Sequence, residues 1–138
     1  MRKLLFGGMV LGAAVVVMLS WNAVGAKDEK GAKGPRIVHG VYFTLKDNTP
    51  QAREKLVTAC KKYLTKHPGT VHFTAGTLVE DLKRPVNDRD FDVALLIVFE
   101  DRKAHDLYQD AERHKQFIEE NKDNWKKVRV FDSVAQAE

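Results

Sequence analysis

The segment Asp92–Phe99 (DVALLIVF) restricts the fold more than any other part of this 138-residue sequence. It has the length of a β-strand, and apolar side chains occupy both of its faces. One face carries the odd-numbered residues and the other carries Ala94, Leu96 and Val98. A strand in a sheet with one solvated face should alternate apolar and polar residues. The run therefore predicts a strand in a sheet that is covered on both sides.

The other periodicities predict an α+β fold with the order βαββαβ. Alternation predicts strands, and helical spacing predicts helices, at these positions: strands 36–45, 71–78, 92–99 and 127–131, and helices 50–66, 102–108 and 112–122. Thr49 suits an N-cap and Pro50 the first helical position. The charged segment 80–90 contains Pro85 and predicts a loop. This order is the split βαβ, or ferredoxin-like, arrangement with a four-stranded antiparallel sheet.

A second copy of the chain is the expected cover for the open face of that sheet. Helices in this arrangement cover one face only, so the apolar run at 92–99 predicts a homodimer through the other face. The alternative is a strand that is apolar by chance. Cys60 is the only cysteine, so an exported chain would have no internal disulfide and would depend on packing. Burial between two copies would help a chain of this size.

The N-terminus has the three parts of a secretory signal peptide. Arg2 and Lys3 precede the apolar stretch Leu4–Leu19, and Val24-Gly25-Ala26 offers small residues for cleavage. The alternative is an uncleaved anchor, although the stretch is shorter than the ~20 residues of a spanning helix. We predict a signal peptide at 1–26, a flexible leader at 27–35, a domain at 36–134 and a tail at 135–138. The predicted location is exported, either periplasmic or secreted, without stable membrane anchoring.

Net charge argues against a nucleic-acid partner. The chain has 23 Lys and Arg residues against 19 Asp and Glu residues. The only basic doublets of the domain are Lys61-Lys62 and Lys126-Lys127, and no aromatic residues alternate with them. A nucleic-acid groove needs a concentrated stripe of positive charge. We expect these doublets to lie on solvated surfaces.

Three stretches resemble the stress-responsive A/B barrel (Dabb) family. They are the first strand His39–Lys46, the strand and acidic cap Phe91–Asp101, and the region from Tyr108 through His114 and Phe117 to Val130-Phe131-Asp132. The resemblance covers about residues 36–134. It implies a ferredoxin-like fold that pairs into a dimeric α/β barrel. Most members of the family have no established activity.

The resemblance also indicates candidate catalytic residues. A plant member is a polyketide cyclase that uses a tyrosine and a histidine near the second helix. These match Tyr108 and His114 here, and a first-strand histidine matches His39. Family members often carry His-Pro just before the second histidine, where this chain has Ala111-Glu112. A neutral histidine can remove a proton next to a carbonyl, while a phenol donates to the oxyanion that forms.

We expect these polar groups in a cleft between helices and sheet, with apolar walls typical of a small-molecule site. The expected lining residues are Val41, Leu56, Cys60, Leu95 and Phe117. The leading hypothesis is a dimer that binds a small apolar or aromatic ligand. The alternative is a cofactor-free cyclase or lyase acting on a polyketide-like carbonyl compound, with His114 as base and Tyr108 as acid. In a purely structural reading, the same residues only satisfy each other.

No cofactor or metal is expected from the sequence. His67 and His72 flank a Pro-Gly turn, and His105 is expected on an exposed helical face, so no set of converging ligands is evident. Cys60 lies on the predicted buried stripe of the first helix and suits a small core residue. A third possibility comes from related dimeric ferredoxin-like families that degrade haem. It would require His39 or His114 to ligate iron, and a Soret band on titration would reveal it.

Overall fold

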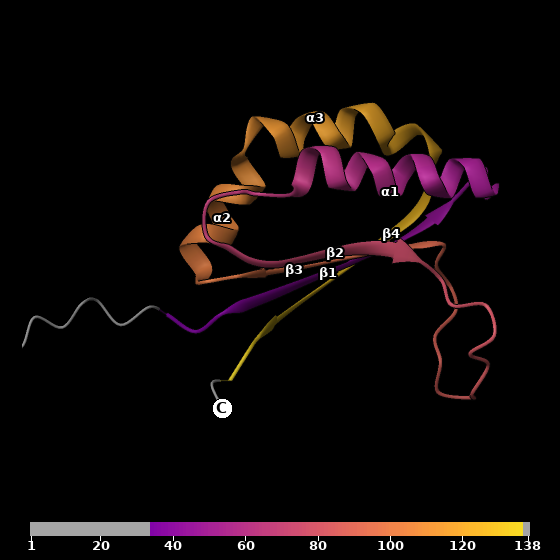
Figure 1. Cartoon of the computed structure of the whole chain (residues 1–138), viewed down its shortest axis with the longest axis horizontal. Coiled ribbons are helices and arrows are strands. Elements are labelled where there is room, and N and C mark those ends of the chain that lie inside the picture. Colours follow the sequence, from indigo (N-terminus) through magenta and orange to yellow (C-terminus); the bar gives the residue numbers. More distant parts are fainter. Residues whose placement is uncertain (1–33, 137–138) are drawn as a thin grey trace, which may run out of the picture. The chain divides into compact units, whose positions relative to one another are not determined.

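A four-stranded antiparallel sheet with the order β2-β3-β1-β4 forms the framework of the computed structural model, which describes residues 34–136. The predicted signal peptide and nearly all of the leader lie outside the described residues, as do the last two residues of the tail. The strands are β1 (Ile37–Leu45), β2 (Thr70–Thr77), β3 (Val93–Phe99) and β4 (Trp125–Val134). The helices are α1 (Pro50–Leu64), α2 (Arg102–Asp110), α3 (Glu112–Asn121) and the short 3-10 helix η1 (Lys122–Asn124). The predicted βαββαβ order is confirmed, and the helices lie on one side of the sheet (Figure 1).

Strand β4 is longer at both ends than the predicted 127–131. It pairs with β1 along the whole of that strand, from Ile37 opposite Val134 to Leu45 opposite Trp125. The flanking residues include Lys126, Asp132 and Ser133, which interrupt the apolar alternation. Their polarity is tolerated because β4 is an edge strand and is mostly exposed.

Helix α1 begins as predicted and ends two residues earlier than predicted. The Thr49 hydroxyl accepts a hydrogen bond from the Ala52 amide at 3.2 Å, with Pro50 in the first helical position. At the other end Thr65 leaves the helical conformation, and its hydroxyl donates to the Lys61 carbonyl at 2.8 Å. Gly69 then adopts a φ of 78°, which favours glycine.

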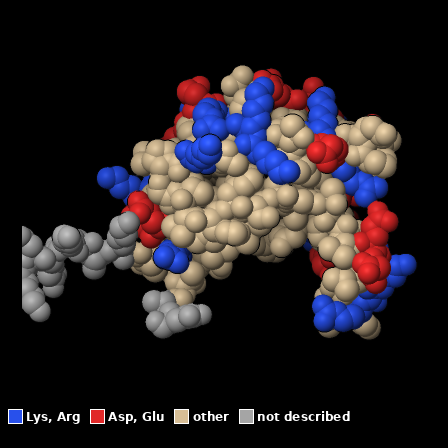
Figure 2. Space-filling view, viewed as in Figure 1, with Lys and Arg blue, Asp and Glu red and all other residues tan. Residues whose placement is uncertain are grey.

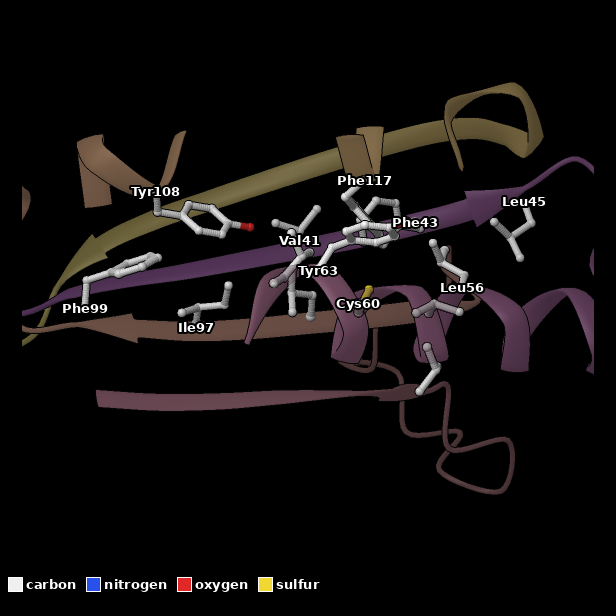
Figure 3. Close-up of a cluster of buried hydrophobic side chains, with 14 of the residues drawn as sticks. Val41, Phe43, Leu45, Leu56, Cys60, Tyr63, Ile97, Phe99, Tyr108 and Phe117 are labelled. Atoms are coloured by element: carbon white, nitrogen blue, oxygen red, sulfur yellow. The ribbon is translucent and has the colours of Figure 1, made fainter. Parts of the chain in front are cut away.

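The core lies between the helices and the sheet. His39, Val41, Phe43 and Leu45 of β1 face the helices, beside the odd-numbered residues of β3. Figure 3 shows aromatic rings and aliphatic side chains from β1, β3, α1, α2 and α3 meeting in this layer. The fully buried side chains include Phe43, Leu64, Ile97 and Phe99. Burial of such side chains supplies most of the folding free energy of a domain that has no disulfide.

Among residues 34–136, no helix covers the opposite face of the sheet (Figure 1). The β2–β3 loop, residues 78–92, extends on this side and is tied to β4 by two ion pairs: Arg129 to Asp88 and Lys127 to Asp90, each at 2.7 Å. Charged side chains gather largely over the helices and this loop, with a mostly uncharged band between them (Figure 2). Within residues 34–136, no helix is long and apolar enough to cross a membrane.

Candidate functional site

A cavity of about 430 Å³ lies between β1 and β4 on one side and α2 and α3 on the other. Its apolar lining residues are Val41, Phe43, Leu64, Leu95, Phe117, Ile118, Trp125, Val128 and Val130. Its polar lining residues are His39, His105, Tyr108, Gln109, His114 and Asp132. Val128 and Val130 belong to the helix-facing side of β4, yet they remain 39% and 51% exposed. The cavity is therefore open to solvent along the edge strand.

His114 is half-buried at the start of α3, with a defined tautomer. Its Nδ1 lies 3.0 Å from the carbonyl oxygen of Gln109. A carbonyl can only accept, so Nδ1 carries the proton and donates it. Burial lowers the pKa of His114, and the neighbouring histidines lower it further against the effect of this hydrogen bond. The neutral imidazole therefore keeps the lone pair of Nε2 available as a base.

Tyr108 lies at the bottom of the cavity and is only 2% exposed. Its ring centroid is 4.5 Å from that of His114 and 5.0 Å from that of Phe99. Figure 3 shows its hydroxyl directed along the core towards Val41. Burial, and to a smaller extent the nearby Cys60, raises the pKa of Tyr108. Among residues 34–136 no group forms a hydrogen bond with this hydroxyl, so it is a neutral phenol free to donate to a ligand.

His39 is a buried residue of β1, and it interacts with Asp132 of the neighbouring strand β4. The two strands place it opposite Asp132, and its Nδ1 lies 2.6 Å from Asp132 Oδ1. Burial lowers the pKa of His39 and outweighs the opposing effect of the Asp132 carboxylate. Its ring is 5.8 Å from that of Tyr108 and 5.4 Å from that of His105. The first-strand histidine thus belongs to the same cluster as Tyr108.

The prediction that His105 is exposed is wrong. His105 is 9% exposed and lies on the buried side of α2 with Ala104 and Tyr108. The spacing of three residues between His105 and Tyr108 already places both on one helical face, and this signal could have identified it. Its Nδ1 lies 3.0 Å from Asp106 Oδ1, and its Nε2 lies 3.9 Å from Asp132 Oδ1.

The structure brings together only some of the predicted lining residues. Val41, Leu95 and Phe117 line the cavity, whereas Leu56 and Cys60 do not. Leu56 lines a separate hollow of about 540 Å³ between α1, the end of α3 and the start of β4. Cys60 is fully buried between α1 and the sheet, where burial raises the pKa of its thiol to about 12. The reason is that α1 packs over β2 and β3, while the cavity opens beside β4.

Besides His105, two polar residues of the cavity, Asp132 and Gln109, are not among the site residues expected from the sequence. Asp132 belongs to one of the family-like stretches, and no sequence pattern singles out Gln109. Gln109 supplies the carbonyl that orients His114, and its side-chain amide lies 3.3 Å from His105 Nε2. His67 is buried, with Nε2 bonded to the Tyr63 carbonyl at 2.9 Å, while His72 is exposed on β2. Neither of these two histidines lines the cavity.

Comparisons with known proteins agree with this architecture. The family model described as Stress Responsive A/B Barrel Domain matches residues 37–135. A Dabb family protein with a ferredoxin-like fold from Mesorhizobium loti is 24% identical, with a TM-score of 0.62 over 75% of this chain and 99% of that one. A dimeric ferredoxin-like protein of unknown function from Thermobifida fusca is 18% identical, with a TM-score of 0.63 over 77% and 96% of the two chains.

A third similar structure is the hydroxynitrile lyase from Passiflora edulis. It is 17% identical, with a TM-score of 0.60 over 74% of this chain and 94% of the lyase. At these identities the structural likeness shows the fold alone. No curated protein matches the sequence.

Proposed function

The chain belongs to the stress responsive A/B barrel domain family, and we propose that this member is a homodimer that binds a small, largely apolar organic molecule. The observation that carries the proposal is the open cavity of about 430 Å³ beside β4. Small-molecule sites are typically hollows of this size with apolar walls and a few polar groups. The described cavity has both features.

The distribution of polar groups indicates what kind of molecule would fit. Phe117, Trp125 and Val130 offer aromatic and aliphatic walls, and Tyr108 and His114 lie side by side with one donor and one acceptor available. A flat apolar molecule with a carbonyl oxygen would contact both the apolar walls and the polar pair. Its body would be buried against the walls, and its oxygen would accept from the Tyr108 hydroxyl.

Calorimetric titration with a series of aromatic ketones tests this binding. We expect Val130→Trp to abolish binding, because the larger side chain would fill the mouth of the cavity. Val71→Trp is the matched control, since Val71 is exposed on β2 and outside the cavity. Equal affinity in the wild type and Val130→Trp, or no binding of any ketone to the wild type, would contradict the proposal.

Acid–base catalysis in the same cavity is the second candidate function. The specific observation in its favour is that His114 has a free Nε2 lone pair while Tyr108 has an unused hydroxyl. His114 would take a proton from the carbon next to a carbonyl, and the electron pair of the broken C–H bond would move to the carbonyl oxygen. Tyr108 would stabilise that oxyanion by donating to it. A hydroxynitrile lyase of similar fold shows that the fold carries catalysis in another protein.

Hydrogen–deuterium exchange at the α-carbon of a bound ketone, followed by NMR, separates catalysis from binding alone. His114→Ala should reduce the exchange rate at least 100-fold, which is within the usual contribution of a general base. It should leave the dimer intact and the melting temperature within a few degrees, because His114 is half-buried with one hydrogen bond. A large fall in melting temperature with unchanged exchange would indicate a structural histidine instead.

The uncovered face of the sheet supports the homodimer. Tyr42, Leu96 and Phe131 lie on it beside Val86 of the β2–β3 loop, around a groove of about 560 Å³. Val86 and Phe131 are exposed in the single chain. Apolar surface of this kind is typical of an association surface, and the T. fusca relative is described as dimeric. A second copy would bury both faces of β3, as its sequence predicts.

Export remains the proposal for the location of the protein. Its support is the charged, apolar and small-residue pattern of residues 1–26. Mass spectrometry of the protein recovered from a bacterial host tests it. A mature N-terminus at Lys27 in the extracytoplasmic fraction is the expected result, and an intact N-terminus in the cytoplasm would contradict it.

A further inference from the structure

Three side chains of types that can bind metal ions, from three different elements, converge at one end of the cavity. His39 comes from β1, His105 from α2 and Asp132 from β4, and one donor atom of each lies within 4.8 Å of those of the other two. Asp132 Oδ1 is 2.6 Å from His39 Nδ1 and 3.9 Å from His105 Nε2. In a tetrahedral site with bonds of about 2.0–2.2 Å, donor atoms lie about 3.3–3.6 Å apart. The observed separations bracket that value.

A hydrogen bond on the second ring nitrogen orients His105, as is usual for histidines that bind metal ions. Its Nδ1 donates to the Asp106 carboxylate at 3.0 Å, and Asp106 is paired with Arg102 at 2.7 Å. A carboxylate on one ring nitrogen fixes the tautomer and makes the other nitrogen a better ligand. The lone pair of Nε2 is therefore directed towards the cluster. In the described state it accepts from the Gln109 amide at 3.3 Å, a contact that a metal ion would replace.

His39 and Asp132 would have to rearrange to bind an ion. The proton that His39 Nδ1 donates to Asp132 would move to Nε2 of the same ring, which frees the Nδ1 lone pair. The Asp132 side chain is 47% exposed, so it can withdraw enough to admit an ion between its oxygen and the imidazole. Among residues 34–136, no Lys or Arg forms an ion pair with Asp132. Its charge is consequently available to a cation.

The ligand types indicate the class of ion. Two neutral imidazoles and one carboxylate suit first-row transition metals, whereas Mg²⁺ and Ca²⁺ prefer oxygen ligands throughout. Three protein ligands leave a coordination position open, as in catalytic zinc sites. All three residues line the cavity, so an ion held by them would lie beside the space proposed for the ligand.

We propose that His39, His105 and Asp132 form a binding site for one divalent transition-metal ion, for which Zn²⁺ is the probe. The proposal departs from the sequence-based expectation of no metal, because Asp132 and His105 come together only in the fold. It does not depend on the proposed organic ligand, since the metal is tested alone.

Calorimetric titration of Zn²⁺ into the full-length chain, expressed without a histidine tag and stripped with a chelator, tests the site. The wild type should bind one equivalent, and Asp132→Asn and His105→Gln should each weaken binding more than about 100-fold. Asp106→Asn should have a smaller effect, about 10–100-fold, because its role is to orient His105. His72→Gln is the matched control, since His72 is an exposed histidine outside the cluster, and it should leave the affinity unchanged.

Spectra with Co²⁺ in place of Zn²⁺ provide a second readout. The wild type should give the visible absorption bands of a low-coordinate site, and Asp132→Asn should lose them. Thermal melting checks that each variant is folded. Asp132 and Asp106 are partly exposed, so we expect their variants to fold. These variants therefore test the site even if His105→Gln does not fold. Wild-type affinity in Asp132→Asn, an equal loss in His72→Gln, or no stoichiometric binding by the wild type would overturn the proposal.

Discussion

The rings of Tyr108 and His114 lie 4.5 Å apart, centroid to centroid, with their planes tilted by 38°, although they belong to different helices. The short break at Ala111 between α2 and α3 makes this possible, because it turns the chain so that both rings face the cavity. The carbonyl of Gln109, near the end of α2, holds His114 in place. An acid and a base are therefore adjacent without being bonded to each other.

Removal of the Tyr108 hydroxyl should separate function from stability. Tyr108→Phe should change the melting temperature by less than about 2 °C, because no described group loses a hydrogen bond. The exchange rate at the α-carbon of a ketone should fall about 100-fold, through the loss of one oxyanion donor. Thermal melting and NMR exchange measure the two effects.

Tyr63→Phe is the matched control for that substitution. The Tyr63 hydroxyl donates to the Glu120 carboxylate at 2.6 Å across the α1–α3 contact. Its loss should lower the melting temperature by a few degrees and leave the exchange rate unchanged. A marked destabilisation by Tyr108→Phe, with exchange unaffected, would favour a structural role for Tyr108.

The pH dependence of exchange should report His114. The base form is active, and burial lowers the pKa of His114 below its ordinary value of 6.5. The rate should therefore rise with pH, pass its midpoint below pH 6.5 and stay level through pH 8, because the raised pKa of Tyr108 keeps the phenol protonated. Rates measured from pH 4.5 to 9 test this. A midpoint above pH 6.5, or a fall between pH 7 and 8, would contradict the assignment.

A charge on the open sheet face should prevent dimerisation. Leu96 lies in the groove of that face, so Leu96→Glu would place a carboxylate in the proposed interface, and burying an unpaired charge there is costly. Sedimentation should show a monomer or unfolded chain in place of a dimer. Leu107→Glu is the control, because Leu107 is exposed on α2. A wild type that is monomeric and fully stable would disprove the dimer.

Gly69 should tolerate no side chain. It has a φ of 78°, and an added Cβ would lie 2.4 Å from the Cβ of Ala104 at the start of α2. Strain and overlap together should cost at least about 2 kcal/mol of folding free energy in Gly69→Ala. Gly76→Ala is the control, because nothing lies within 4 Å of the added atom. Denaturant unfolding of both variants measures the difference, and equal stability would contradict the strain argument.

Local sequence patterns were sufficient to predict the order of the strands and helices. They also predicted which sides of β1 and α1 face the core. Alternation along β1 placed His39 on the helix-facing side, and helical spacing placed Cys60 in the core, because both periodicities are properties of the backbone alone. The helix N-cap Thr49 followed from side-chain chemistry in the same way. The pairing of Tyr108 with His114 came from the family resemblance rather than from spacing.

The tertiary structure decided what these residues meet. Asp132 faces His39 only because β4 pairs with β1 in the observed register, and those residues are 93 positions apart in the chain. Leu56 and Cys60 lie outside the cavity because α1 packs over β2 and β3, whereas the cavity opens beside the edge strand β4. The sequence by itself determined the order of the strands and helices along the chain and most of the buried apolar residues, with the buried His105 as an exception. Contacts between distant elements depend on strand register and on helix placement, which no local periodicity encodes.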